Sequence, residues 1–222
     1  MSVYVTGTDT GVGKTVASAA LLHALRRDGG PAVGMKPVAS GCDATPQGWR
    51  NADALALQDA SVPPPPYSLV NPYALPLATA PQLAARSAGV VVELAPILAA
   101  YRELRQACPR VVVEGVGGWL APLADGLEQA DLVRALDLPV VLVVGLKLGC
   151  LNHARLTARA VAADGCRLVG WIGCDSEPGE PLPADYLALV AQSLPAPCLG
   201  RLPHLPGAAP DRLSGQLRTD WA

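Results

Sequence analysis

The stretch VYVTGTDTGVGKT, residues 3–15, decides the fold of this chain. It joins a short apolar run to a small, polar turn and then to residues of helical pattern, which predicts a strand, a loop and a helix in succession. Backbone N–H groups from Gly11 to Thr15 would surround phosphate oxygens at the helix N-terminus. Lys14 would reach the β- and γ-phosphates, and the Thr15 hydroxyl would hold Mg²⁺. The stretch therefore predicts a nucleotide-binding phosphate loop.

The spacing of this loop departs from the common one. Five residues separate Gly7 from Gly13 where four are usual, and Thr8 occupies the standard glycine position. An ordinary glycine-rich turn is the alternative interpretation, but the order of strand, GKT and helix favours nucleotide binding. The expected nucleotide contacts in the loop are Thr10, Gly11, Val12, Gly13, Lys14, Thr15 and Val16. A phosphate loop alone does not say whether the nucleotide is a switch, a motor fuel or a substrate.

Composition limits the class of protein. The chain has 222 residues, of which 50% are hydrophobic and 16% charged, and its formal net charge is -2. This composition gives no support to disorder and disfavours a basic nucleic-acid surface. The apolar runs are too short to span a membrane, and no signal-peptide pattern is present, so we expect a cytoplasmic protein with no membrane or nucleic-acid partner. Its six cysteines show no CxxC spacing and are expected to be free thiols.

Short β-branched runs alternate with longer stretches of helical period along the chain. The predicted strands are 2–6, 32–36, 110–114, 139–145, 167–173 and 197–200. The predicted helices are 13–27, 52–60, 82–87, 94–107, 128–136, 152–164 and 184–193. This alternation predicts an α/β fold: a single-domain three-layer sandwich over residues 1–222, with a mostly parallel β-sheet flanked by helices, as in P-loop NTPases. Residues 206–222 are expected to form a weakly patterned C-terminal tail.

Polar side chains at the carboxyl ends of strands are the next candidates, because ligands of open α/β sheets gather there. Glu114 ends an apolar run and precedes a glycine-rich turn, so it could ligate Mg²⁺ or be a solvated loop carboxylate. Lys36 ends another run and could contact a transferred phosphate or a carbamate, or simply extend into solvent. Asp53 begins a helix, where a contact with the helix dipole competes with a Mg²⁺ role.

A turn after the fourth predicted strand is a further candidate. Lys147 and the segment from Gly149 to His153 follow this strand, and a helix expected to begin at Asn152 would have free N–H groups that could bind a carboxylate. A structural role for this turn is equally open at this point. Cys150 has no motif that would make it a nucleophile, and the three histidines have no metal-ligand spacing.

Taken together, these motifs resemble the dethiobiotin synthetase family. The resemblance covers residues 2–203 and rests on motifs in the family's order. They are TGTDT with VGKT, KPVASG at 36–41, NADALALQ at 51–58, VNPY at 70–73, VEG with GGW at 113–119, and VVG with KLGC at 143–150. The resemblance implies a parallel sheet with flanking helices in a homodimer.

The resemblance also implies a reaction. An ATP-dependent ligase of this family carboxylates 7,8-diaminononanoate with CO2, phosphorylates the carbamate and closes the ring to give dethiobiotin, ADP and phosphate in biotin biosynthesis. ATP is then a co-substrate and Mg²⁺ the implied metal. Two lysines and several metal ligands near one anion suit this chemistry, because carbamate and γ-phosphate are both negative.

Site residues carried over from the family follow their motifs. Thr15, Asp53 and Glu114 would be the Mg²⁺ ligands, and Lys14 and Lys36 the catalytic lysines. The implied substrate contacts are Lys36, Ser40, Gly117, Gly118, Gly149, Cys150, Leu151, Asn152 and Tyr186. The turn at 149–152 would bind the substrate carboxylate across the dimer interface. Glu114, Cys174 and Asp175 complete the expected nucleotide contacts.

Two positions depart from the family pattern. Gly11 stands where the family often has an acidic side chain, so any contact from that side chain is absent here. Cys174 precedes Asp175 where the family often has an asparagine that contacts the nucleotide base. A thiol cannot offer the paired donor and acceptor of an amide, so we hypothesise relaxed base selectivity.

Three alternatives remain open from sequence. A regulatory P-loop ATPase of the partitioning type shares the expected sheet, but such proteins usually carry a signature lysine early in the loop, where this chain has Thr, Asp, Thr, Gly and Val at 8–12. Another ring-forming ligase of corrinoid assembly usually brings a glutaminase domain, for which there is no room. A non-catalytic homologue is the third alternative, because Gly11 and Cys174 depart from the pattern.

Overall fold

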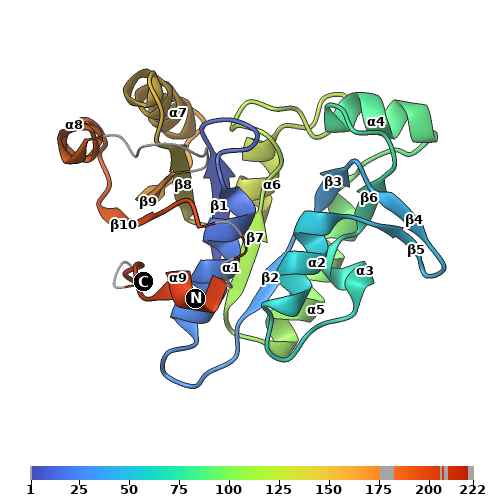
Figure 1. Cartoon of the computed structure of the whole chain (residues 1–222). Helices are drawn as coiled ribbons and strands as arrows, with labels where there is room; N and C mark the ends of the chain where they lie inside the picture. The colour runs from blue at the N-terminus through green and yellow to red at the C-terminus, as the bar shows by residue number, and fades with distance from the viewer. Residues whose placement is uncertain (1, 176–182, 206, 208–209, 220–222) are drawn as a thin grey trace.

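A six-stranded parallel sheet forms the centre of the computed structural model, which describes residues 2–175, 183–205, 207 and 210–219 (Figure 1). Its strands run in the spatial order β10-β9-β8-β1-β7-β2. Their bounds are β1 Val3–Gly7, β2 Val33–Met35, β7 Val111–Glu114, β8 Val140–Gly145, β9 Leu168–Cys174 and β10 Cys198–Leu202. Because β1 pairs with both β7 and β8, the loop that follows β1 emerges at the middle of the sheet's carboxyl edge.

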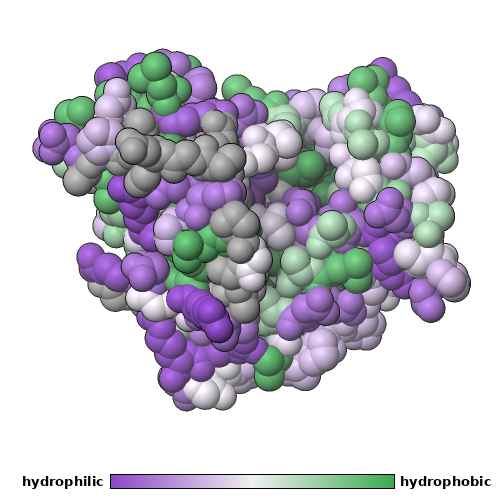
Figure 2. Space-filling model, in the orientation of Figure 1, coloured by the Kyte–Doolittle hydropathy of each residue, from purple (hydrophilic) through white to green (hydrophobic). Residues whose placement is uncertain are grey.

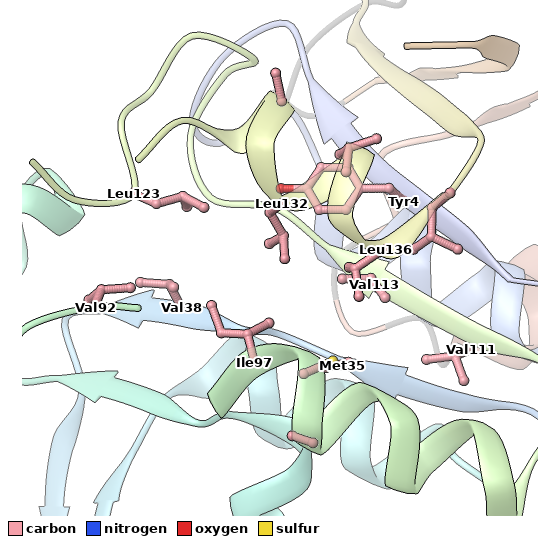
Figure 3. Close-up of a cluster of buried hydrophobic side chains, with 14 of the residues drawn as sticks. Tyr4, Met35, Val38, Val92, Ile97, Val111, Val113, Leu123, Leu132 and Leu136 are labelled. Atoms are coloured by element: carbon pink, nitrogen blue, oxygen red, sulfur yellow. The ribbon is translucent and has the colours of Figure 1, made fainter. Parts of the chain in front are cut away.

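Helices cover both faces of this sheet, since alternate strand residues point to opposite sides. Val3 and Val5 of β1 pack with α1, α2 and α9, whereas Tyr4 packs with α5, α6 and α7, and α8 covers β8 and β9 on that same face. The bounds are α1 Lys14–Leu25, α2 Ala52–Asp59, α5 Leu94–Ala107, α6 Gln129–Leu136, α7 Cys150–Ala163, α8 Ala184–Ser193 and α9 Pro210–Ser214. Figure 3 shows Tyr4 lying among Val113, Leu132 and Leu136 in this core.

Smaller elements lie between β2 and α5, on the right in Figure 1. Strands β3 Val38–Ser40 and β6 Tyr73–Leu75 form a parallel pair, and β4 Asp43–Thr45 and β5 Gly48–Arg50 form an antiparallel hairpin. Helices α3 Tyr67–Val70 and α4 Pro81–Ala88 complete this region. Strands of three residues carry too little periodicity to be found in sequence, and these four strands and α3 were missed.

The three-layer α/β prediction is confirmed, and so are all six predicted central strands and seven helices, within a few residues at their ends. Two expectations need correction. Helix α7 begins at Cys150 after Gly149, a glycine N-cap with φ 96°, so Asn152 lies inside its first turn. The expected weakly patterned tail contains the short helix α9, and Leu213 within this helix and Leu217 after it are buried against the α1 side of the sheet. Within the described residues no helix is both long and apolar enough to cross a membrane.

Candidate active site

The phosphate loop adopts a conformation that requires glycine at two positions. Gly11 has φ 74° and Gly13 has φ 91°, values at which a side chain would strain the backbone. Gly13 is the N-cap of α1 and supplies no side-chain hydrogen bond, so the first N–H groups of that helix remain open to an anion. The Lys14 ammonium folds back over the loop and donates to the Asp9 carbonyl at 2.9 Å. The loop thus has the geometry of a phosphate site.

Lys36 lies at the centre of a buried charged cluster made with Thr15, Asp53 and Glu114. Its ammonium donates to Glu114 Oε1 at 2.6 Å, to Asp53 Oδ2 at 3.2 Å and to the Gly115 carbonyl at 3.0 Å. The Thr15 hydroxyl donates to the same Glu114 oxygen at 2.9 Å. Lys36 and Glu114 are buried, whereas the Asp53 side chain is 46% exposed. Four residues from four separate segments therefore meet beside the phosphate loop.

Burial and neighbouring charges shift the pKa values of this cluster. Burial by itself lowers the pKa of Lys36, but the carboxylates of Glu114 and Asp53 more than offset it, and the pKa lies above its usual value. Burial acts to raise the pKa of Asp53, but Lys36 outweighs it and holds the pKa below the usual range. Burial, and then repulsion from Lys36, lowers the pKa of Lys14 to about 8. An anion placed between the two lysines would relieve that repulsion.

The oxygen atoms of the charged cluster fit a magnesium ion. Glu114 Oε2 is buried, and no donor in the described part of the chain reaches it, although Oε1 accepts two hydrogen bonds. A hydroxyl, a buried carboxylate oxygen and the half-exposed Asp53 carboxylate are hard oxygen donors. Among residues 2–175 and the later described segments, no three His, Cys, Asp or Glu side chains form a complete metal cluster. Mg²⁺ takes few carboxylates and completes its shell with water and phosphate, so the donor chemistry of Thr15, Asp53 and Glu114 is compatible with it.

Two asparagines for which the sequence predicts no role position the charged cluster. Asn51 caps α2, because its side-chain oxygen accepts from the Asp53 and Ala54 N–H groups, and its amide nitrogen donates to the Ser40 carbonyl at 3.3 Å. Asn71 donates from Nδ2 to the Lys36 carbonyl at 2.6 Å. An asparagine directly before the Ala52–Asp59 helix is a capping signal that could have identified Asn51. Asn71 lies in the VNPY motif, but the motif does not indicate its contact with Lys36, which is 35 residues away.

An open cleft of about 640 Å³ adjoins the phosphate loop, within the usual range for ligand pockets. Ser40, Gly117 and Gly118, three of the predicted substrate contacts, line it. The other lining residues are Asp9, Thr10, Ala78, Thr79, Ala80, Pro81, Val116 and Ala121. Figure 2 shows the surface hollowed between α4 on the right and α7 on the left. Ala78 to Pro81 were missed, since small apolar residues in a loop carry no chemical signal.

The remaining predicted substrate residues lie outside that cleft. The turn from Gly149 to Asn152 begins α7, and Tyr186 lies in the first turn of α8, where it packs on the α7–α8 core. Neither is among the described residues that line the cleft. Within one chain, the turn at 149–152 and Tyr186 therefore do not line the cleft beside Ser40. That a second subunit supplies them to this cleft stays a prediction.

A second pocket, of about 350 Å³, lies on the other side of the loop and brings Gly11, Gly13 and Val16 beside Cys174 and Asp175. The Asp175 carboxylate accepts two hydrogen bonds of 2.9 Å from Arg201. Cys174 is only 4% exposed, and burial, together with nearby Asp175, raises the pKa of its thiol to about 11. The thiol is therefore neutral at physiological pH. The loop, Cys174 and Asp175 are thus brought together as predicted, and Arg201 is an addition.

The phosphate loop, the carboxylates and Lys36 at one edge of a parallel sheet define a P-loop nucleotide-binding protein. A family model described as an AAA domain matches residues 1–212. An ATP-dependent dethiobiotin synthetase of Xanthomonas campestris pv. campestris is 60% identical over 97% of this chain and 96% of its own length. One from Xylella fastidiosa is 59% identical over 96% of this chain and 95% of its own. The chain belongs to the ATP-dependent dethiobiotin synthetase family.

Solved structures with little sequence identity support the fold alone. A ParA family ATPase of Chlorobium tepidum TLS has a TM-score of 0.57 at 14% identity and covers 96% of this chain and 90% of its own. The MinC:MinD cell division complex of Aquifex aeolicus gives a TM-score of 0.52 at 13% identity, over 97% of this chain and 86% of the matched one. These likenesses confirm the expected P-loop NTPase architecture.

Proposed function

We propose that this chain is an ATP-dependent cyclo-ligase that converts 7,8-diaminononanoate and CO2 to dethiobiotin, with ADP and phosphate as the other products. The observation that carries the proposal is the position of Lys36. Its buried ammonium donates to Glu114 Oε1, which also accepts from Thr15 of the phosphate loop, and to the carbonyl of Gly115, two residues before Gly117 in the lining of the cleft. A γ-phosphate on one side and a carbamate on the other would meet there.

The proposed reaction balances without an oxidant or reductant. One substrate amine combines with CO2 to form a carbamate and releases a proton. A carbamate oxygen attacks the γ-phosphorus of ATP, and the bond from that phosphorus to the ADP oxygen breaks. The second amine then attacks the carbamate carbon, and phosphate leaves with the former carbamate oxygen while the amine loses a proton. The product is a cyclic urea.

The two lysines have distinct tasks in this scheme. Lys14 would contact the β- and γ-phosphates from the loop, and Lys36 would hold the carbamate oxygen against the γ-phosphorus. Both anions repel each other, so fixed cations between them lower the barrier by electrostatic stabilisation and positioning. Lys36 already forms ion pairs with Glu114 and Asp53, which keep its ammonium protonated and oriented before substrate binds.

Thr15, Asp53 and Glu114 are the residues we propose to hold Mg²⁺. When bound, this ion would neutralise charge on the β- and γ-phosphate oxygens. The fit is supported by the buried, unpartnered Glu114 Oε2 and by the adjacent Thr15 hydroxyl. The Asp53 carboxylate, which is partly open to solvent, could bind through water.

We also propose a homodimer in which the turn at residues 149–152 of one subunit binds the substrate carboxylate in the cleft of the other. Exposed leucines near this turn support a subunit interface: Leu148 is 81% exposed, and Leu120 and Leu156 are also exposed. The open N–H groups at the start of α7 suit a carboxylate. Tyr186 of α8 would assist. A Leu156→Asp variant that stayed dimeric by light scattering would contradict this interface.

The base pocket supports relaxed nucleotide selectivity. Cys174 offers a buried neutral thiol in place of an amide, and Asp175 is already paired with Arg201. Similar Michaelis constants for ATP and CTP are expected. A strong preference for ATP would show that other groups select the base.

Free thiols at all six cysteines support a reducing, cytoplasmic location for the reaction.

The test of the proposed function is product formation by the purified chain with Mg²⁺, ATP and bicarbonate, with and without 7,8-diaminononanoate. We expect dethiobiotin by mass spectrometry and phosphate release that depends on the diamine. Phosphate release that ignores the diamine would favour a regulatory ATPase of the partitioning type. No release at all would indicate a non-catalytic homologue.

A further inference from the structure

One wall of the substrate cleft has no regular secondary structure of its own. The segment GVGGWLA, residues 115–121, is named here the glycine loop; it follows Glu114 directly, and Val116, Gly117, Gly118 and Ala121 of it line the cleft. Within it a single backbone bond, from the Ala121 N–H to the Gly118 carbonyl, is made at 3.0 Å among the described contacts. Its remaining carbonyls need partners from elsewhere, because buried backbone groups are rarely left unpaired.

Gln129 supplies those partners from the first turn of α6. The side chain is completely buried, and its Nε2 lies 3.0 Å from the Val116 carbonyl, 3.3 Å from that of Trp119 and 3.2 Å from that of Ala121. The Gly118 carbonyl also accepts from it. An amide nitrogen has two N–H bonds, so the carbonyls share them. One side chain thus contacts most of the glycine loop.

Tyr4 fixes the orientation of this amide. The Tyr4 hydroxyl is buried and lies 2.7 Å from Gln129 Oε1. Carbonyl oxygens only accept, so the amide nitrogen must face the loop and its oxygen must face the hydroxyl, which donates. The Tyr4 ring also contacts the Trp119 ring edge to face, with centroids 6.4 Å apart. Strand β1, which carries the phosphate loop, is thereby tied to the glycine loop.

Gly115, at the start of the loop, has no room for a side chain. A Cβ built on it would lie 2.3 Å from Gln129 Oε1 and 2.5 Å from the Tyr4 hydroxyl, and on the opposite side Lys36 donates to its carbonyl. At the other end, Trp119 Nε1 donates to Asp164 after α7 at 2.6 Å. The loop is therefore held from several elements, and Gln129 makes the central contacts.

We propose that Gln129 is a positioning residue that holds the glycine loop in the shape that accepts the diamine, and so sets the affinity for that substrate rather than the rate of phosphoryl transfer. The inference rests on the proposed function. Gln129 touches neither the phosphate loop nor the charged cluster among the described contacts. Its loss should therefore leave ATP binding and the chemical step in place.

The test compares steady-state kinetics of Gln129→Leu with the wild type. Leucine has a similar volume but no amide, so the loop carbonyls lose their donor. We expect the KM for the diamine to rise about tenfold, as for the loss of one or two hydrogen bonds, with kcat and the KM for ATP within about twofold. An unchanged diamine KM, or an equal rise in both KM values, would overturn the proposal.

A matched control and a second variant separate positioning from stability. Gln58 lies on α2, away from the cleft, and its amide donates to the Pro65 carbonyl. Gln58→Leu removes this amide and should leave the diamine KM unchanged. Tyr4→Phe removes only the hydroxyl that orients Gln129 and should raise the same KM, by a smaller factor. If Gln129→Leu fails to fold, Tyr4→Phe decides alone, and an unaltered diamine KM in it contradicts the proposal.

Hydrogen exchange of residues 115–121 gives a readout independent of the reaction. Exchange in this loop should be faster in Gln129→Leu than in wild type, while exchange in α1 stays the same. Equal exchange in the loop would overturn the inference even if the wild type made no dethiobiotin. If the wild type made no dethiobiotin but loop exchange were faster in Gln129→Leu, the proposed function would be contradicted. The role of Gln129 in holding the glycine loop would still be supported.

Discussion

The two sides of the glycine loop are held by opposite kinds of chemistry. On one side, Lys36 donates to the Gly115 carbonyl from a cluster with Glu114 and Asp53. On the other side, the neutral amide of Gln129 donates to the next carbonyls, and the Tyr4 hydroxyl donates to Gln129 Oε1. Charge gathers where phosphate and carbamate would react, and neutral groups shape the wall that would contact the aliphatic substrate. In the proposed scheme the charged side therefore acts in catalysis, and the neutral side sets the affinity for the substrate.

Replacing Lys36 by alanine tests the charged side most severely. We expect kcat to fall roughly 100- to 1000-fold, as for the loss of one preorganised electrostatic donor, with phosphate release and dethiobiotin formation falling together. The diamine KM should change little, the reverse of the Gln129→Leu pattern. Coupled assays of phosphate and product measure both parameters.

The Lys36→Ala protein also leaves the Glu114 carboxylate buried without its main partner, which costs about 3 kcal/mol or more. Lys36→Met keeps the volume of the stem and is the control for packing, with thermal unfolding followed by circular dichroism. If Lys36→Met formed dethiobiotin near the wild-type rate, the role assigned to the Lys36 ammonium would be wrong.

Replacing Glu114 by glutamine weakens the charged side without removing its shape. The amide keeps the size of the carboxylate but loses its charge, so the Mg²⁺ concentration for half-maximal activity should rise about tenfold or more. A Mg²⁺ titration at saturating ATP measures this. Gln129→Leu is the control and should have the wild-type titration midpoint; an unshifted midpoint in Glu114→Gln would remove Glu114 from the metal site.

Replacing Cys174 by asparagine should alter neither side of the glycine loop. The new amide offers a donor and an acceptor to the base, so the preference for ATP over CTP should rise about three- to tenfold, as for one added hydrogen bond. The diamine KM should stay the same. Competition between the two nucleotides gives the ratio, with Cys174→Ser as control. An equal gain in Cys174→Ser would mean that the amide itself is not the cause.

An exposed ion pair contrasts with the buried one at Lys36 and gives the smallest effect. Arg110 hydrogen-bonds Asp28 through both carboxylate oxygens and lowers the pKa of Asp28 to about 2. Because the folded pKa lies below the unfolded value of about 3.9, the pair stabilises above that value and its contribution is lost as pH falls from about 4 to about 2.

Urea unfolding of wild type and Asp28→Asn across this range measures that contribution. The difference between their midpoints should be small near pH ~6 and vanish near pH ~2, because exposed pairs contribute little. A difference that grew on acidification would contradict the assigned sign. Asp28 is chosen over Arg110, whose guanidinium also donates to the Leu25 carbonyl at 2.6 Å.

Sequence patterns predicted the charged side of the site and not the neutral side. Lys14, Thr15, Lys36 and Glu114 each end or follow an apolar strand, and parallel strands bring such ends together, so local signals were enough. Gln129 and Tyr4 meet across 125 residues: Gln129 belongs to no motif, and Tyr4 is predicted only as an apolar strand residue before the phosphate loop. The small sheets and α9 were missed for a related reason, since their stability comes from packing rather than from local periodicity.

The most direct test of the central claim, that carbamate and γ-phosphate are joined at Lys36, is the fate of oxygen from labelled bicarbonate. With bicarbonate carrying heavy oxygen, a single turnover completed before exchange with water should place one heavy oxygen in the released phosphate, measured by mass spectrometry. Lys36→Ala should release almost none. Dethiobiotin formed together with unlabelled phosphate would contradict the account.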